Sequence, residues 1–321
     1  MTSARAGVDL GATKIQVVVV GEDNAVLGEA KTETPTKGGP TAVVAKIEGA
    51  VQEAANAAGI AVGELHGTGV GSPGAVDQDA GTVAHARNLP DWDEPFPLAE
   101  ALGKALGTTV RIDNDVKVAV TAELELGAGR PYASLLGVWW GTGVGGGIVL
   151  DRRLWRGRGA AGEIGHMVIK RNGARCPCGR RGCLEAYAGR GAMEAHARRL
   201  VKRGRKTDLF ELMEKRKRDR LTSGVWADAL EREDELATAL IDRAVAALGA
   251  GIGSAVNLLD VEAVIVGGGL GTRLGEPFVE RIAEAAQPHL FVDERPPAML
   301  PAALGDLGGA IGAALLVESA S

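Results

Sequence analysis

Two glycine-rich turns, one near the N-terminus and one near the middle of the chain, each join a pair of short apolar strands. The first turn is Asp9-Leu10-Gly11-Ala12-Thr13-Lys14, and the second runs from Gly141 to Gly147. In both places one strand leads into glycine and threonine, and a second strand leaves. This restart of one pattern predicts two structurally related halves, with a site in the cleft between them.

Strands alternate with helical patterns after both turns, which predicts an α/β fold. No linker rich in proline or serine separates the halves. We expect an N-terminal α/β domain over residues 1–120, with a last helix at 307–321 packing back on it, and a C-terminal α/β domain over 121–306. The expected strands are 7–10, 15–20, 25–33, 67–71, 109–112, 133–140, 145–150 and 263–266. The expected helices are 41–58, 98–106, 114–126, 184–200, 209–218, 235–259, 277–286 and 308–317, and 267–269 is expected to form a turn.

The charge balance argues against nucleic acid or an anionic membrane as a partner. Among 321 residues, 36 Lys and Arg face 41 Asp and Glu, a net charge of −5. Residues 198–220 are a local exception, with eleven basic and four acidic side chains. A solvated face is the favoured interpretation of this basic stretch, and a polyphosphate or nucleic-acid patch is the alternative.

The chain shows no sign of export or of membrane insertion. No apolar stretch of secretory length opens the sequence. The uncharged stretch 244–259 is shorter than the ~20 residues that span a bilayer, and we expect a buried helix there. All three cysteines fall within eight positions, too close for a disulfide framework. A reducing, cytoplasmic location is therefore expected.

The glycine-rich turns are candidate phosphate sites, because backbone N–H groups without bulky side chains can approach phosphate oxygens. In the first turn Asp9 can reach the waters of a magnesium ion. An ordinary hairpin turn, or a strand packed on a neighbouring backbone, is the alternative. No Walker-type phosphate motif, Gly-x-x-x-x-Gly-Lys-Ser/Thr, occurs in the sequence. The candidate nucleotide-binding residues are Asp9, Gly11, Ala12, Thr13, Lys14, Gly141, Thr142, Gly143, Gly268 and Gly269.

A metal-ligand pattern occupies the loop 163–185. Cys176, Cys178 and Cys183 supply three thiolates, and His166 lies ten residues upstream. Four protein ligands with no open position suit structural zinc rather than catalytic zinc. The alternative is a group of buried or reactive cysteines without metal.

Asn114 and Asp115 directly follow an expected strand and open a helix. A carboxylate at the start of a helix can act as a general base, and Asp115 is a candidate for that role. The alternative is a pair of residues that only caps the helix.

The order of these motifs resembles the ROK family of sugar kinases and repressors. The motifs that carry the resemblance are Asp9–Lys14, Gly71–Asp77, Asn88–Trp92, Asn114–Asp115, Gly141–Gly143, Glu163–His166 and Cys176–Glu185. Ala12 and Lys117 depart from the family pattern. The resemblance implies an actin-like (hexokinase/ribonuclease H-like) ATPase fold, Mg-ATP, zinc and a homodimer or higher homo-oligomer. It also implies Asp115 as the base, and sugar hydroxyls held by Asn88, Asn114, Asp115, Glu163, His166 and Glu185.

The function that this resemblance implies is ATP-dependent transfer of a phosphoryl group to the 6-hydroxyl of a hexose, with glucose as the leading substrate. Two other kinds of enzyme remain as alternatives. One is a kinase for fructose, mannose or an N-acetylhexosamine, and the other is a glucokinase that uses polyphosphate as the donor. A sugar-sensing repressor is the alternative of another class. Such repressors carry a helix-turn-helix ahead of the first turn, and only Met1–Val8 precedes Asp9 here.

Overall fold

The computed structural model describes residues 3–86 and 89–317. The chain forms two compact units: unit 1 is Met1–Gly127 with Ala303–Ser321, and unit 2 is Ala128–Ala302. Each unit is built on its own five-stranded sheet.

The sheet of unit 1 has the strand order β3-β2-β1-β4-β7. β1 pairs antiparallel with β2, and β2 pairs antiparallel with β3. β4 runs parallel to both β1 and β7, so three strands point the same way. The bounds are β1 Arg5–Leu10, β2 Lys14–Val20, β3 Val26–Glu33, β4 Gly67–Ser72 and β7 Val110–Asn114, with a separate hairpin of β5 Ala75–Asp77 and β6 Thr82–Ala84.

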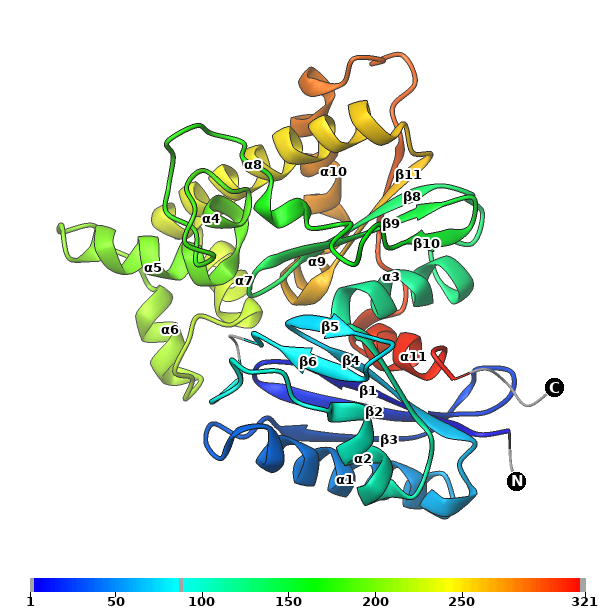
Figure 1. The fold of residues 1–321 in the computed structure, drawn as a ribbon. Coiled ribbons are helices and arrows are strands. Elements are labelled where there is room, and N and C mark those ends of the chain that lie inside the picture. Colours follow the sequence, from blue (N-terminus) through cyan, green and yellow to red (C-terminus); the bar gives the residue numbers. More distant parts are fainter. Residues whose placement is uncertain (1–2, 87–88, 318–321) are drawn as a thin grey trace. The chain divides into compact units, whose positions relative to one another are not determined.

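Helices cover both faces of this sheet (Figure 1). α1 (Gly39–Ala57) and α2 (Leu98–Leu106) lie on one face, and α11 (Gly308–Ala314) packs on the other beside α3 (Asp115–Leu126). The last four residues of β2 are all valine because both faces of the strand are covered: Val17 and Val19 join the core with α1, while Val18 and Val20 join α11. Gly69 allows the close approach of α11, because a Cβ there would lie 1.7 Å from the Ala313 carbonyl oxygen.

The sheet of unit 2 repeats the order and the strand directions of unit 1, as β10-β9-β8-β11-β12. β8 and β10 flank β9 antiparallel, and β11 runs parallel to β8 and β12. The prediction of two structurally related halves is confirmed. The bounds are β8 Leu135–Trp140, β9 Val144–Leu150, β10 Arg153–Trp155, β11 Ala263–Gly267 and β12 Ala298–Pro301.

The helices of unit 2 pack around its longest helix, α8, which contacts α4, α5, α7 and α10. Figure 1 shows α8 alongside α10. By length and composition α8 could cross a membrane, but 67% of its apolar window is buried inside the protein, as expected for a core helix. The bounds are α4 Glu185–Ala188, α5 Arg190–Val201, α6 Leu209–Lys215, α7 Ser223–Glu231, α8 Glu235–Leu259, α9 Gly268–Leu274 and α10 Glu276–Ala286.

The structure differs from the prediction at several elements and adds others. The expected helix 184–200 is broken at Gly189, because the next two N–H groups bond to the carbonyls of Gly141 and Thr142. The expected turn at 267–269 is the end of β11 and the start of α9. The helices expected at 209–218 and 308–317 end earlier, at Lys215 and Ala314. The elements not predicted are β5, β6, β10, β12 and α7.

Candidate functional site

In unit 1, the parallel pairing of β1, β4 and β7 brings two of the predicted acidic residues, Asp9 and Asp115, to the same end of these strands. Asp9 of β1 is in register with Gly71 of β4, and Gly71 is in register with Asp113 of β7. Asp115 begins α3 two residues further on. A Cβ on Gly71 would lie 2.7 Å from Val118 Cγ2 and 3.3 Å from Asp115 Cα, so the absence of a side chain lets α3 lie against β4. The two carboxylates therefore belong to one electrostatic environment.

The Asp9 carboxyl group is strongly perturbed. Burial is the main cause that raises its pKa to about 7, and Asp115 and Asp306 add to the shift while Lys14 opposes it. Lys14 Nζ lies 3.4 Å from Asp306 Oδ2. Gly309 makes room for Asp9, since a Cβ there would lie 2.9 Å from its carboxylate. An acidic group at a strand end, held partly neutral mainly by burial, suits recognition of a cation that arrives with a substrate.

The first glycine-rich turn is held from two sides. Gly11 donates its N–H to the Lys14 carbonyl at 3.0 Å, and the Thr34 hydroxyl donates to the Gly11 carbonyl at 2.7 Å. Thr13 is exposed, whereas Gly11 and Ala12 are half-buried. The turn is therefore a fixed backbone loop that opens to solvent next to Asp9.

Asn114 caps α3, which was the structural alternative for this pair. Its Oδ1 accepts hydrogen bonds from the N–H groups of Val116 at 3.1 Å and Lys117 at 3.2 Å. Asp115 Oδ1 accepts from Val116 N–H at 2.9 Å. Capping orients both side chains at the start of the helix, and it is compatible with a catalytic role for Asp115. Lys117, the departure from the family pattern, is buried in the first turn.

In unit 2 the four predicted metal ligands come together. One ligand atom from each of His166, Cys176, Cys178 and Cys183 lies within 4.8 Å of the other three. Cys176 Sγ is 3.9 Å from His166 Nδ1, and Cys178 Sγ is 3.8 Å from Cys183 Sγ. Two thiolates bound to one zinc ion at about 2.3 Å with tetrahedral angles lie about 3.8 Å apart. The donor set and its spacing fit a closed tetrahedral zinc site.

The three thiols differ in acidity. Burial raises the pKa of Cys176 and of Cys183. Burial also acts to raise the pKa of Cys178, but the N–H of Arg180 and the other two thiols lower it to about 7. Buried neutral thiols become good ligands once a cation replaces their protons.

The metal-ligand cluster adjoins two predicted sugar-binding carboxylates. Glu163 Oε2 lies 3.9 Å from His166 Nε2, on the side of the ring away from Cys176. Glu185 Oε1 lies 3.7 Å from Cys176 Sγ, and its Oε2 accepts a 3.0 Å hydrogen bond from Val144 N–H. A Cβ on Gly143 would lie 2.3 Å from Glu185 Oε2. The second glycine-rich turn is thus packed directly against Glu185, a candidate sugar-binding residue.

Two polar residues at the second turn were missed by the sequence analysis. Arg190 donates to the hydroxyls of Thr142 and Ser223, each at 2.8 Å. A Cβ on Gly269 would lie 3.4 Å from the Ser223 hydroxyl oxygen. The signal that could have found Arg190 is the Gly189-Arg190-Gly191 sequence, which interrupts an otherwise helical pattern.

The remaining predicted residues are three glycines and Asn88. Gly141 and Gly269 are neighbours, since a Cβ on Gly141 would lie 3.8 Å from Gly269 N. Gly268 has a φ of +81°, and a Cβ there would meet the Trp140 backbone at 2.8 Å. Asn88 lies outside the described residues.

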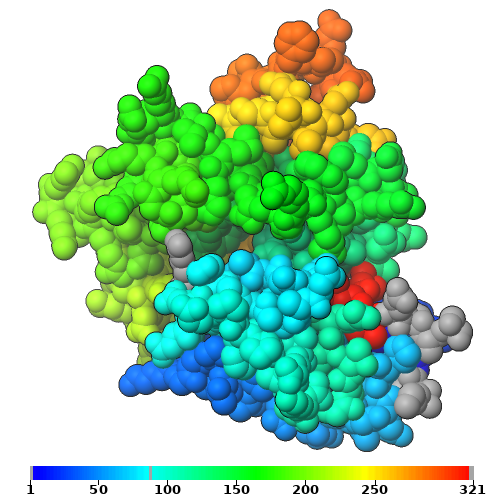
Figure 2. Space-filling model, viewed as in Figure 1, coloured from blue at the N-terminus to red at the C-terminus, as the bar shows by residue number. Residues whose placement is uncertain are grey.

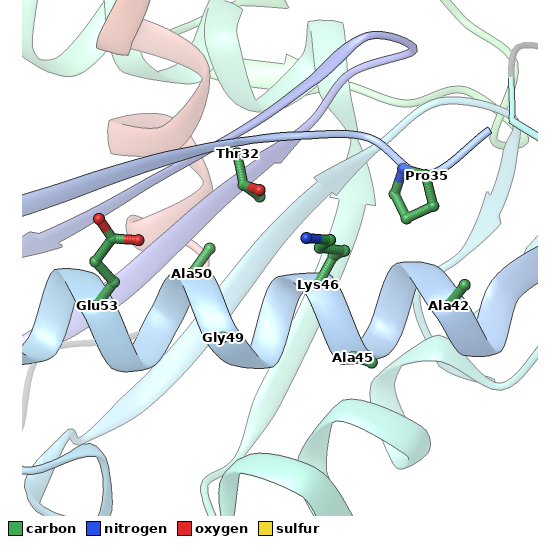
Figure 3. Close-up of a pocket in the computed structure, with 8 residues that line it drawn as sticks. All are labelled: Thr32, Pro35, Ala42, Ala45, Lys46, Gly49, Ala50 and Glu53. Carbon is green, nitrogen blue, oxygen red and sulfur yellow. The ribbon is translucent and has the colours of Figure 1, made fainter. Parts of the chain in front are cut away.

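A separate surface groove of about 600 Å³ lies between β3 and α1 (Figure 3). Lys46 and Glu53 of α1 line it together with Thr32 and Pro35. None of the predicted site residues lines this groove.

The basic stretch lies on the surface of unit 2, in yellow-green in Figure 2. Arg198 pairs with Glu194 on its own helix, and Arg216 pairs with Asp228 of α7. These ion pairs and the exposure agree with a solvated face.

Comparison with known proteins identifies the family. The model of the ROK family matches residues 5–320. The glucokinase of Thermotoga maritima is 33% identical over 287 residues, 88% of each chain. An N-acetylgalactosamine kinase of Shewanella sp. (strain ANA-3) is 30% identical over 97% of this chain and 95% of its own. The crystal structure of a ROK family glucokinase from Streptomyces griseus, in complex with glucose and AMPPNP, superposes with a TM-score of 0.84 at 31% identity, covering 98% of this chain and 99% of that one. The expected actin-like ATPase fold is confirmed, and the chain belongs to the ROK family.

Proposed function

We propose that this protein is an ATP-dependent hexose kinase that converts glucose to glucose 6-phosphate. The observation that carries the proposal is the placement of Asp9 and Asp115 at one edge of the unit 1 sheet, beside a solvent-open glycine turn. A carboxylate at a helix start and a second carboxylate next to a glycine-rich turn suit the proton acceptor and the metal-binding group that phosphoryl transfer to an alcohol requires. The similarity to glucokinases across nearly the whole chain supports this choice.

In the proposed mechanism Asp115 accepts the proton of the sugar 6-hydroxyl as that oxygen attacks the γ-phosphorus of ATP. The bond between the γ-phosphorus and the β,γ-bridging oxygen breaks, and ADP leaves. Asp9 would hold the magnesium ion that accompanies the nucleotide through its waters, and that ion would neutralise charge on the transferred phosphoryl group. The backbone at Gly11, Ala12 and Thr13, with Lys14, faces the phosphate groups of the donor. In unit 2 the candidate phosphate-binding residues are Gly141, Thr142, Gly143, Gly268 and Gly269.

Recognition of the sugar is proposed for Asn88, Asn114, Asp115, Glu163, His166 and Glu185. Carboxylates accept from sugar hydroxyls and an amide or imidazole donates to them, so each epimer leaves a different set of groups unpaired. Asp115 would both bind the 6-hydroxyl and accept its proton.

A structural zinc ion is part of the proposal. His166, Cys176, Cys178 and Cys183 would hold it, since their donor atoms have the spacing of a tetrahedral site. With His166 Nδ1 on the metal side, Nε2 remains on the side of Glu163. The metal would fix the loop that presents Glu163, His166 and Glu185.

Glucose is the preferred acceptor in this proposal, with ATP as the donor. The family also contains kinases for N-acetylated sugars, so the acceptor is the part of the proposal that most needs an assay. A cytoplasmic location and a homo-oligomeric state, both expected from the sequence, belong to the same proposal.

The test is an ADP-release assay with Mg-ATP and a panel of glucose, mannose, fructose, N-acetylglucosamine, N-acetylgalactosamine and N-acetylmannosamine. Parallel reactions replace ATP with polyphosphate and follow the sugar phosphate. We expect turnover with glucose and ATP to exceed that of every other pair. Faster turnover of another sugar would make that sugar the substrate. No turnover of any sugar in the panel by folded, zinc-loaded protein would favour a sugar-sensing protein.

A further inference from the structure

Arg190 places a cation beside the second glycine-rich turn, and the mechanism above does not use it. The side chain is half-buried at the start of α5. Its two terminal nitrogens donate to the hydroxyls of Thr142 and Ser223, both at 2.8 Å. Both partners are neutral, so these bonds orient the guanidinium without balancing its charge.

Within residues 3–86 and 89–317, no ion pair joins Arg190 to a carboxylate. Glu194, one turn further along α5, instead accepts bonds from Arg198 and from the N–H of Leu221. Burial lowers the pKa of Arg190, and the nearby cation Arg220 acts in the same direction while Glu194 opposes them. A partly desolvated guanidinium without an acidic partner favours a bound anion.

The space next to the guanidinium is kept open by glycines. A Cβ on Gly269 would lie 3.4 Å from the Ser223 hydroxyl and 4.0 Å from Arg190. A Cβ on Gly141 would in turn lie 3.8 Å from Gly269 N. A side chain at Gly269 would therefore enter the space beside the Arg190 guanidinium, and Gly141 leaves room for the backbone of Gly269.

The backbone holds Arg190 and the turn in one rigid arrangement. The Arg190 N–H bonds to the Gly141 carbonyl at 3.1 Å, and the Gly191 N–H bonds to the Thr142 carbonyl at 3.0 Å. A ligand that contacts the turn therefore meets a guanidinium whose position is already set, which lowers the entropic cost of binding.

We propose that Arg190, oriented by Thr142 and Ser223, binds the phosphate groups of the phosphoryl donor. This inference rests on the proposed function and names a donor-binding residue for it. The ligand class is a phosphoanhydride chain, which guanidinium groups bind through paired N–H donors. That chain can come from ATP or from inorganic polyphosphate.

The experiment measures equilibrium binding by calorimetry, without turnover. Wild-type protein, Arg190→Gln and Arg190→Lys are titrated with AMPPNP and magnesium, with inorganic polyphosphate, and with glucose. Arg199→Gln is the matched control, because Arg199 is an exposed arginine on the same helix. Glucose binding reports on the folded state of each variant. If Arg190→Gln lowers the melting temperature, donor binding of Arg190→Lys, which keeps the positive charge, is compared with that of the wild type instead.

We expect Arg190→Gln to weaken donor binding by about 10-fold or more, the usual loss for a charge-assisted hydrogen bond. Arg190→Lys should lose less, and Arg199→Gln should bind like the wild type. Glucose affinity should not change in any variant. The donor that shows this loss, AMPPNP or polyphosphate, identifies the source of the phosphate chain.

Unchanged donor affinity in Arg190→Gln would overturn the inference and leave Arg190 as a support for the turn. Wild-type protein that binds neither donor would overturn it as well. Failure of the proposed function is distinguishable: a protein that phosphorylates no sugar but loses donor binding in Arg190→Gln would refute the kinase and retain the anion site.

Discussion

Asp9 couples folding to pH because its carboxyl group resists ionisation in the folded protein. Its pKa is raised from an ordinary value of 3.8 to about 7. In the unfolded chain it ionises near the ordinary value, so the folded state loses stability as pH rises from about 4 to about 7, and the loss is complete above 7. Below about pH 4 the Asp9 carboxyl group is protonated in both the folded and the unfolded state, so it does not change the stability of the protein there.

Asp9→Asn should therefore stabilise the protein most at high pH. We expect the difference in melting temperature between Asp9→Asn and wild type, without magnesium, to increase from pH 4 to pH 8. Asp79→Asn, a change at an exposed aspartate, is the control. Differential scanning calorimetry across this range checks the sign, and a difference that does not vary with pH would contradict the assignment.

The position of the Glu185 carboxylate depends on the absence of a side chain at Gly143. A methyl group at residue 143 would lie 2.3 Å from Glu185 Oε2, so Gly143→Ala should displace the carboxylate from its bond to Val144 N–H. We expect the KM for the sugar to rise by about 10-fold or more. Gly191→Ala is the control, because its Cβ would meet Thr142 O at 3.6 Å, an ordinary contact. Equal KM values in the two variants would exclude Glu185 from sugar binding.

At the scale of elements, the packing of α11 on the sheet depends on glycine. Gly69→Ala would place a Cβ 1.7 Å from the Ala313 carbonyl oxygen, which forces the helix away from β4. The free energy of unfolding should fall by about 3 kcal/mol, the upper part of the range for overpacked cores. Gly63→Ala, with no atom within 4 Å of its Cβ, should change it little. Denaturant titration of the two variants separates these outcomes.

The loop between β10 and α4 should depend on metal. If zinc holds His166 and the three cysteines, purified protein should contain about one zinc per chain. A zinc-selective chelator should lower both the melting temperature and the affinity for sugar, and added zinc should restore them. Elemental analysis and thermal melts measure this, and zinc-free protein of unchanged stability would remove the metal from the account.

Elements with a strong local pattern were predictable, and elements shaped by distant contacts were not. The strand pairs around both turns and the core helix α8 follow from apolar periodicity. The break at Gly189 does not, because it depends on bonds from Arg190 and Gly191 to residues about fifty positions earlier in the chain. Short edge strands such as β10 and β12 carry too few residues for a periodic signal.

For the molecule as a whole, the repeated turn predicted the repeated sheet order, and the cysteine spacing predicted the cluster of metal-ligand side chains. The cluster of His166 with three cysteines follows from the short spacing of the cysteines and the chemistry of zinc ligands. The neighbours of Asp9 could not be predicted, since Asp306 reaches Lys14 from the other end of the chain. Ser223 likewise meets Arg190 only through the tertiary fold.

The most direct test of the account is phosphorus NMR of the reaction of wild-type protein and Asp115→Asn with Mg-ATP and glucose. The account predicts that wild type converts the γ-phosphorus signal of ATP into that of a hexose 6-phosphate. Asp115→Asn should slow this conversion by at least ~100-fold while glucose still binds. Transfer by Asp115→Asn at the wild-type rate, or hydrolysis of ATP by wild type without a sugar phosphate, would contradict it.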